Sequence, residues 1–171
     1  QVLGRTIGGY FIVAFDLAFV ITFYLLTKKL FGWWDPASTL FDPDVIATPF
    51  PWISSVSRAL GAGFWEECLF RAIPIAGAAL IGDRLGRRKQ WIIIGFIIQS
   101  LIFAAAHANY PSYPAYARLV ELILPSVIFG LLYLQFGLLP AIISHFIYNA
   151  ILMSLPIFTS TASGMWFDQL M

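Results

Sequence analysis

Residues 138–158 read LLPAIISHFIYNAILMSLPIF, an apolar run that contains no acidic residue, lysine or arginine. The hydrocarbon core of a bilayer is about 30 Å thick, and roughly 20 apolar residues are needed to cross it as an α-helix. The run is long enough to do so. It therefore predicts a transmembrane helix, on which His145 and Asn149 are four residues apart and share a face.

Four further apolar stretches have the length of a membrane span, with approximate bounds 7–30, 53–81, 91–107 and 117–136. Because backbone groups in lipid must be hydrogen-bonded inside the protein, a membrane domain is built from helices or a closed β-barrel. The strict alternation typical of a barrel strand is absent from these stretches. The sequence predicts an all-α bundle of about five transmembrane helices. Whether the tail Thr159–Met171 belongs to a sixth transmembrane helix stays an open alternative.

The composition indicates a multi-pass integral membrane protein. Hydrophobic residues make up 60% of the 171 and charged residues only 11%, and the mean hydropathy is +0.82. A soluble domain carries about 25% charged residues, so this chain has too few of them to cover a surface that faces water. The lipid bilayer is its expected surrounding. The net charge of +1 gives no electrostatic basis for binding nucleic acid.

No internal repeat and no linker divides the chain. We therefore predict a single membrane domain over residues 1–171. Because the chain begins at Gln1 and ends in what resembles the start of another apolar segment, we expect it to be part of a longer protein.

The second apolar stretch carries Glu66, Glu67 and Arg71 near its middle. An ionisable side chain at mid-membrane costs about 2.5–3.5 kcal/mol on insertion scales and indicates a functional site by default. Glu67 and Arg71 are four residues apart, so they share a helix face and are predicted to pair. Glu66 lies about 140° around an α-helix from Arg71. A structural ion pair would explain Glu67 and Arg71 but would leave Glu66 without a role.

The two histidines of the chain, His107 and His145, both fall in predicted membrane segments. A histidine in a membrane helix is often only a hydrogen-bond partner for a neighbouring helix, and that alternative stays open for each one alone. Together with Glu66 and Asn149 they suit hydrolysis. A carboxylate with an imidazole can take a proton from water, and an imidazole with a carboxamide can donate hydrogen bonds to a developing oxyanion.

Three short motifs in these segments match those of a known family. Residues 66–71 (EECLFR), 103–107 (FAAAH) and 145–149 (HFIYN) fit the patterns EExxxR, FxxxH and HxxxN in the same order. The chain thus resembles the CAAX-protease and bacteriocin-processing (CPBP) family, which includes the type II CAAX prenyl endopeptidases. The resemblance covers about residues 53–155, which would be the catalytic core.

The resemblance implies an intramembrane endopeptidase that acts on a membrane-associated protein or peptide. Glu66 and His107 would activate water, while His145 and Asn149 would stabilise the oxyanion. The implied catalytic set is Glu66, Glu67, Arg71, His107, His145 and Asn149.

The implied mechanism leaves open whether a metal ion takes part. The chain has no HExxH motif, and a zinc site needs three or four protein ligands. We expect a glutamate mechanism without a metal or another cofactor. The alternative is zinc bound by Glu66, His107 and His145.

Two other functions compete with proteolysis. A non-catalytic scaffold or immunity-type protein on the same fold would bind a peptide without cutting it, but it would not need both glutamates and both histidines. A proton-coupled transporter would also use buried Glu and His residues, although the absence of internal repeats argues against it.

Several residues outside the motifs carry weaker expectations. Asp16 is the one acidic residue of the first apolar stretch and could line a polar pocket or contact a neighbouring helix. Arg118 and Glu121 are three residues apart and are expected to form a surface pair. Gly61 and Gly63 are expected to permit close approach of another helix.

Overall fold

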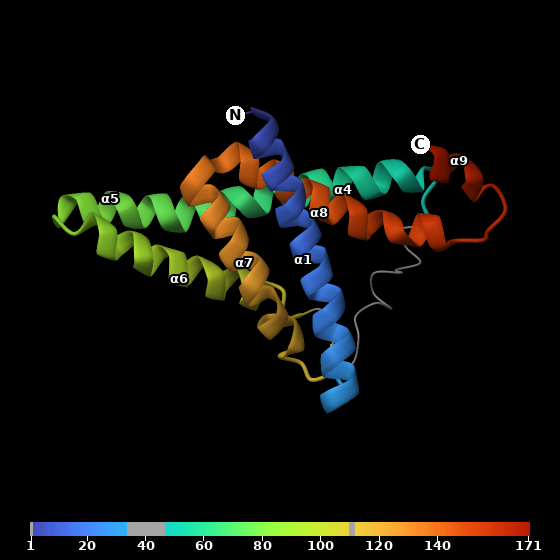
Figure 1. Ribbon diagram of the computed structural model, residues 1–171, viewed down its shortest axis with the longest axis horizontal. Coiled ribbons are helices and arrows are strands. Elements are labelled where there is room, and N and C mark those ends of the chain that lie inside the picture. Colours follow the sequence, from blue (N-terminus) through green and yellow to red (C-terminus); the bar gives the residue numbers. More distant parts are fainter. Residues whose placement is uncertain (1, 34–46, 110–111) are drawn as a thin grey trace.

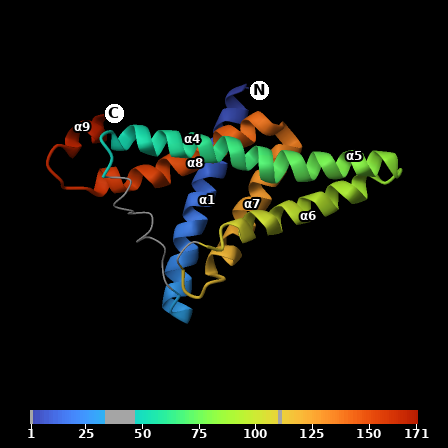
Figure 2. The same ribbon diagram turned by 180° about the vertical axis from the view of Figure 1, so that it is seen from behind.

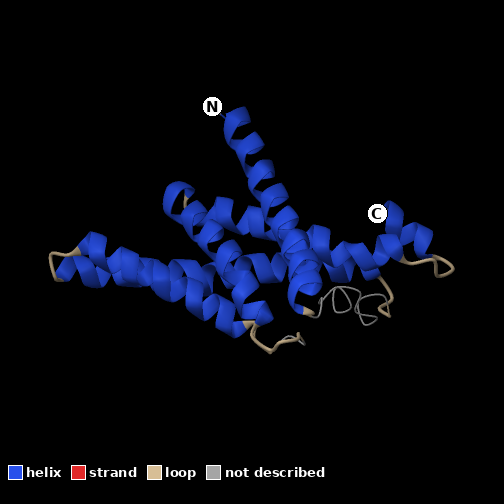
Figure 3. Cartoon of the chain, turned by 60° about the horizontal axis from the view of Figure 1, so that its bottom comes forward, coloured by secondary structure: helices blue, strands red, loops and turns tan. Residues whose placement is uncertain are grey.

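The computed structural model describes residues 2–33, 47–109 and 112–171, which are helical apart from short connections (Figure 3). No strand occurs among these residues. The predicted all-α class is confirmed. In chain order the elements are α1 (Val2–Phe31), α4 (Pro51–Glu67), η1 (Cys68–Ala76), α5 (Gly77–Arg84), α6 (Arg88–Ala106), α7 (Ala117–Phe136), α8 (Leu138–Thr159) and α9 (Met165–Leu170).

The predicted spans correspond closely to these helices. Within the described part of the chain, α1, α6, α7 and α8 are long and apolar enough to cross a membrane. The remaining span, predicted at 53–81, is the unbroken helix formed by α4, η1 and α5. α9 has 6 residues, which is too short to cross a bilayer. The chain is therefore an integral, multi-pass membrane protein.

The helices α4, η1 and α5 form one long helix that runs along the longest direction of the molecule (Figure 1). α8 runs beside α4, and α6 folds back beside α5, while α1 and α7 cross this layer steeply (Figures 1 and 2). The return from α5 to α6 uses Gly86, whose φ of +65° lies in the left-handed region that glycine adopts without strain. This arrangement brings the ends of α4 and α6 and the middle of α8 together.

The contact between α4 and α8 is close because small residues line it. A Cβ added to Gly63 would lie 2.9 Å from the backbone nitrogen of Phe146, so only glycine fits at this crossing. The Ser55 hydroxyl donates a hydrogen bond to the carbonyl oxygen of Met153 at 3.0 Å. The prediction is confirmed for Gly63 and wrong for Gly61, where an added Cβ would meet nothing within 4 Å.

The segment η1 is a π-helix of 9 residues that contains Pro74. Proline cannot donate a backbone hydrogen bond, and its ring clashes with the carbonyl four residues earlier in an α-helix, so the wider π-turn accommodates it. π-Turns are rare and often lie at functional sites. The predicted angle between Glu66 and Arg71 assumed a uniform α-helix, and the π-segment changes it because Arg71 lies within η1.

Candidate active site

Glu66 lies near the end of α4 and faces both histidines of the chain. Its Oε2 atom is 3.6 Å from Nε2 of His107, which caps α6. The same oxygen is 3.7 Å from Nε2 of His145 on α8. Both separations are slightly longer than a hydrogen bond. The structure thus brings together three polar side chains that are far apart in sequence.

The second nitrogen of each imidazole is already engaged. Nδ1 of His107 lies 2.8 Å from the carbonyl oxygen of Phe103, and Nδ1 of His145 lies 2.7 Å from Oε1 of Glu67. A carbonyl and an ionised carboxylate can only accept, so in each ring Nδ1 carries the hydrogen. In the neutral rings, both Nε2 atoms therefore present lone pairs toward Glu66.

Glu67 and Arg71 lie next to His145 and Glu67 respectively, and both of their side chains are fully buried. Nη1 of Arg71 is 3.4 Å from Oε1 of Glu67, so the predicted pair is present. The guanidinium also lies 4.0 Å from the centre of the Phe103 ring, a favourable cation–π contact. The sequence analysis missed that Glu67 is also the partner of His145. Glu67 and His145 are 78 positions apart in the sequence. The predicted pair with Arg71 already gave Glu67 a partner, so no second partner was expected.

Aromatic rings fix the planes of the imidazoles. Phe129 of α7 stacks on His145 with ring centres 4.7 Å apart and an angle of 17° between the planes. Phe103 packs against His107 at 4.7 Å. Apolar walls of this kind keep the polar centre small and hold each ring in one orientation.

Asn149 is half-buried and lies one turn after His145 on α8. Among the described residues, no hydrogen bond joins it to Glu66 or to either histidine. The structure therefore places it one helical turn from His145, with no hydrogen bond to the cluster among the described residues.

The three facing atoms do not have the spacing of a zinc site. Tetrahedral zinc with bonds of about 2.0–2.1 Å places its ligand atoms about 3.3 Å apart, whereas the separations from Glu66 here are 3.6 Å and 3.7 Å. No group of three His, Cys, Asp or Glu residues in the described part of the chain could hold a metal ion. We expect the reaction to proceed without a metal, and this expectation remains a prediction.

A second group of charged residues lies outside the three motifs. Arg118 and Glu121 form the predicted pair, with Nη1 and Oε2 2.6 Å apart, but the expectation of a surface pair is wrong because Glu121 is fully buried. Spacing along one helix predicted the pair. It could not predict that α1 packs over it and supplies Tyr24 as a further partner.

Comparison with known proteins gives two matches. A family model described as "Type II CAAX prenyl endopeptidase Rce1-like" matches residues 48–151, a range that holds all three motifs and excludes α1. The chain is also 25% identical over 137 residues to the sporulation-killing factor biosynthesis protein SkfC of Bacillus subtilis (strain 168), which covers 80% of this chain and 26% of SkfC. The chain thus spans about a quarter of the length of this relative. No solved structure matches the chain.

Proposed function

Because the chain belongs to the type II CAAX prenyl endopeptidase Rce1-like family, we propose that it is an intramembrane endopeptidase of the glutamate type. The observation that carries the proposal is the convergence of Glu66 Oε2 with the Nε2 atoms of His107 and His145. The proposed substrate is a membrane-associated protein or peptide.

The first step is the activation of water by Glu66. A water molecule between Glu66 and His107 donates one hydrogen bond to the carboxylate and one to the Nε2 lone pair. Its oxygen then attacks the carbonyl carbon of the scissile peptide bond while Glu66 accepts a proton. The Phe103 carbonyl holds His107 in the tautomer that this step requires.

The exposure of the two glutamates supports this division of roles. The side chain of Glu66 is 24% exposed, whereas that of Glu67 is 0% exposed. Water can therefore reach Glu66 but not Glu67. Glu67 acts instead as a positioning residue for His145.

The second step is stabilisation of the oxyanion by His145 and Asn149. Nδ1 of His145 is committed to Glu67, so Nε2 can donate a hydrogen bond only when the ring carries both protons. The carboxylates of Glu66 and Glu67 together would balance that positive charge and the charge of Arg71. The carboxamide of Asn149 is a donor in any state and would complete the oxyanion site.

The last step breaks the peptide bond. Glu66 returns its proton to the amide nitrogen, the C–N bond breaks, and the electron pair leaves with the new amine. The products are a carboxylic acid and an amine, which become a carboxylate and an ammonium group when the acid proton passes to the amine, and the enzyme regains its ionised Glu66. One water molecule is consumed for each bond that is cut.

The proposal is tested by comparing the peptides of cells that carry the wild-type protein with those of cells that carry Glu66→Gln. We expect product peptides to disappear while the variant stays folded, because glutamine keeps the shape but cannot accept the proton. Product peptides that persist in Glu66→Gln would contradict the proposal. Product peptides that are absent from both strains, with a peptide bound equally by both proteins, would favour the non-catalytic scaffold.

Two substrate classes should be assayed first. The family description names CAAX prenyl endopeptidases, so a prenylated CAAX protein is one. The relative SkfC is named for the biosynthesis of a sporulation-killing factor, so a precursor of such a factor is the other.

A further inference from the structure

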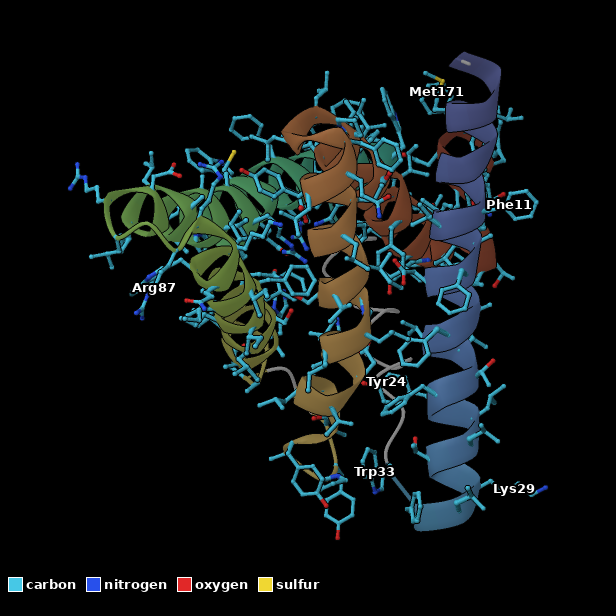
Figure 4. All side chains as sticks on the ribbon, turned by 60° about the vertical axis from the view of Figure 1, so that its left-hand side comes forward. Phe11, Tyr24, Lys29, Trp33, Arg87 and Met171 are labelled. Carbon is cyan, nitrogen blue, oxygen red and sulfur yellow. The ribbon has the colours of Figure 1, made fainter. Side chains whose placement is uncertain are left out.

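A second buried centre of ionisable residues lies between α1, α7 and α8. Asp16 and Tyr24 come from α1, Arg118 and Glu121 from α7, and Tyr148 from α8. Asp16 and Glu121 are both 0% exposed. Figure 4 shows Tyr24 extending from α1 toward α7. Neither the motifs nor the proposed reaction uses these residues, and α1 lies outside the family match.

The two carboxylates of this centre have very different surroundings. Oε2 of Glu121 pairs with Arg118 at 2.6 Å and accepts a hydrogen bond from the Tyr24 hydroxyl at 3.2 Å. Both oxygens of Asp16 are buried and accept no hydrogen bond from any described residue. Asp16 is nevertheless near enough to Glu121 for their charges to act on each other.

The charges of the centre do not balance when all groups are ionised. Among the described residues of this centre, two carboxylates accompany one guanidinium, because the hydroxyls of Tyr24 and Tyr148 are neutral in their ordinary form. An isolated buried carboxylate is very costly, and such a group normally becomes neutral instead. One positive charge must therefore accompany Asp16, and the smallest that fits a packed helix interface is a proton.

A purely structural role does not explain Asp16. Its neighbours on the same face of α1, Val13 and Val20, belong to an apolar cluster with residues of α7 and α8. A leucine at position 16 would suit that surrounding better than an acid. An intramembrane acid that its packing does not require indicates function.

We propose that Asp16 is a proton-binding site whose occupancy is coupled to the docking of α1 against α7 and α8. When α1 is docked, the carboxyl is fully buried without a hydrogen-bond partner among the described residues and holds the proton. When α1 moves away, the carboxyl meets water and releases the proton to it. Glu121 on α7 and Tyr148 on α8 are the titratable groups that act on it electrostatically, and Glu121 in turn interacts with Arg118, Tyr24 and His107.

The sign of the coupling follows from proton counting. The docked form binds one more proton than the undocked form, so rising pH favours the undocked form. For one proton the docking equilibrium constant falls by at most about tenfold per pH unit. Asparagine at position 16 imitates the protonated acid, so docking in Asp16→Asn should not depend on pH.

Pulsed electron paramagnetic resonance measures the docking directly. Nitroxide labels are placed on cysteines at Phe11 of α1 and Leu131 of α7, which are 72% and 44% exposed, in a Cys68→Ser background in lipid nanodiscs. We expect one distance at low pH and a growing second population as pH rises. The pH dependence should vanish in Asp16→Asn and in Asp16→Leu, and it should persist in the catalytic variant Glu66→Gln.

Infrared difference spectroscopy identifies the proton. We expect the carbonyl band of a protonated carboxylic acid at neutral pH, present in wild type and absent from Asp16→Asn. A band that Asp16→Asn leaves unchanged would overturn the proposal, as would a label distance that is the same at every pH. Docking that follows the sodium concentration at fixed pH would also overturn it, because the charge would then be a metal cation. Because Glu66→Gln keeps both signals, failure of the proteolytic proposal would leave this one standing.

Discussion

The candidate active site and the α1–α7–α8 centre contain almost the same charged groups, but the surroundings of these groups differ. Each has two buried or half-buried carboxylates and one arginine, and in each the arginine lies within 4 Å of one carboxylate. At the active site the remaining carboxylate, Glu66, is partly exposed and faces two imidazoles. In the other centre the remaining carboxylate, Asp16, is fully buried and accepts no hydrogen bond from the described residues.

The difference indicates which features a carboxylate inside the membrane needs before it can transfer a proton in a reaction. Pairing with arginine makes a second carboxylate tolerable in both places but gives it no reaction. In the proposed mechanism, access to water and neighbouring lone pairs allow Glu66 to move a proton between bound molecules. Without them, Asp16 can only hold or release a proton as its helix moves.

The largest test of this comparison is the replacement of each active-site glutamate by glutamine. Glu67→Gln removes the charge that compensates buried Arg71 and the partner of His145, so it should lower the free energy of unfolding by about 3–5 kcal/mol. Glu66→Gln should unfold close to the wild type because its carboxylate is partly exposed. Melting curves in detergent measure both, and the reverse order would mean that the two roles are exchanged.

The oxyanion role of Asn149 predicts a loss of rate rather than of stability. Removing one oxyanion donor typically lowers kcat by about 10²–10³, so Asn149→Ala should show this loss with an unchanged melting temperature. Single-turnover cleavage of an identified substrate measures it. A variant that cleaves at the wild-type rate would remove Asn149 from the mechanism and leave His145 as the one proposed donor.

Several of these residues could be placed from the sequence, and others could not. The apolar runs predicted the helices within a few residues, and the four-residue spacing predicted the pair of Glu67 and Arg71. The bond between Glu67 and His145 depends on how α4 packs against α8, which no spacing within one segment reveals. The π-segment that contains Pro74 was not predicted, because the stretch 53–81 was treated as a uniform α-helix.

The second centre shows the same limit more strongly. Spacing predicted that Arg118 and Glu121 would pair, yet their burial depends on the docking of α1, a helix about a hundred residues earlier in the chain. Asp16 was visible as an acid in an apolar helix. That its carboxylate is fully buried without a hydrogen-bond partner among the described residues could be seen only in the folded protein.

A smaller effect tests the polar contact that holds α1. Tyr24→Phe removes the hydroxyl that donates to Glu121, and hydrogen bonds to charged groups contribute about 1.5–3 kcal/mol. We expect a loss of stability in this range with proteolysis retained, because the active-site contacts are untouched. Thermal unfolding together with a cleavage assay checks it, and a loss of cleavage without a loss of stability would show that the two centres are not separable.

The smallest predicted effect separates two glycines of α4. Gly63→Ala should cost about 1–3 kcal/mol by overpacking and should reduce activity, because the added methyl group pushes α8 and His145 away from Glu66. Gly61→Ala, where the added carbon meets open space, is the matched control and should change stability by less than about 0.5 kcal/mol. Equal effects of the two variants would mean that the close crossing does not set the site.

The position of Glu66 along α4 also determines how far a substrate must reach. α4 begins at Pro51, where Trp52 donates a backbone hydrogen bond to Asp168 of α9 and where tryptophans such as Trp166 would suit the boundary between lipid and water. At a rise of 1.5 Å per residue, Glu66 lies roughly 20 Å along the helix from this end. An extended peptide advances about 3.3 Å per residue. A chain that enters beside Pro51 would therefore need about six or seven unfolded residues between the membrane boundary and the bond that is cut, so α4 would measure its substrates by length as well as by sequence.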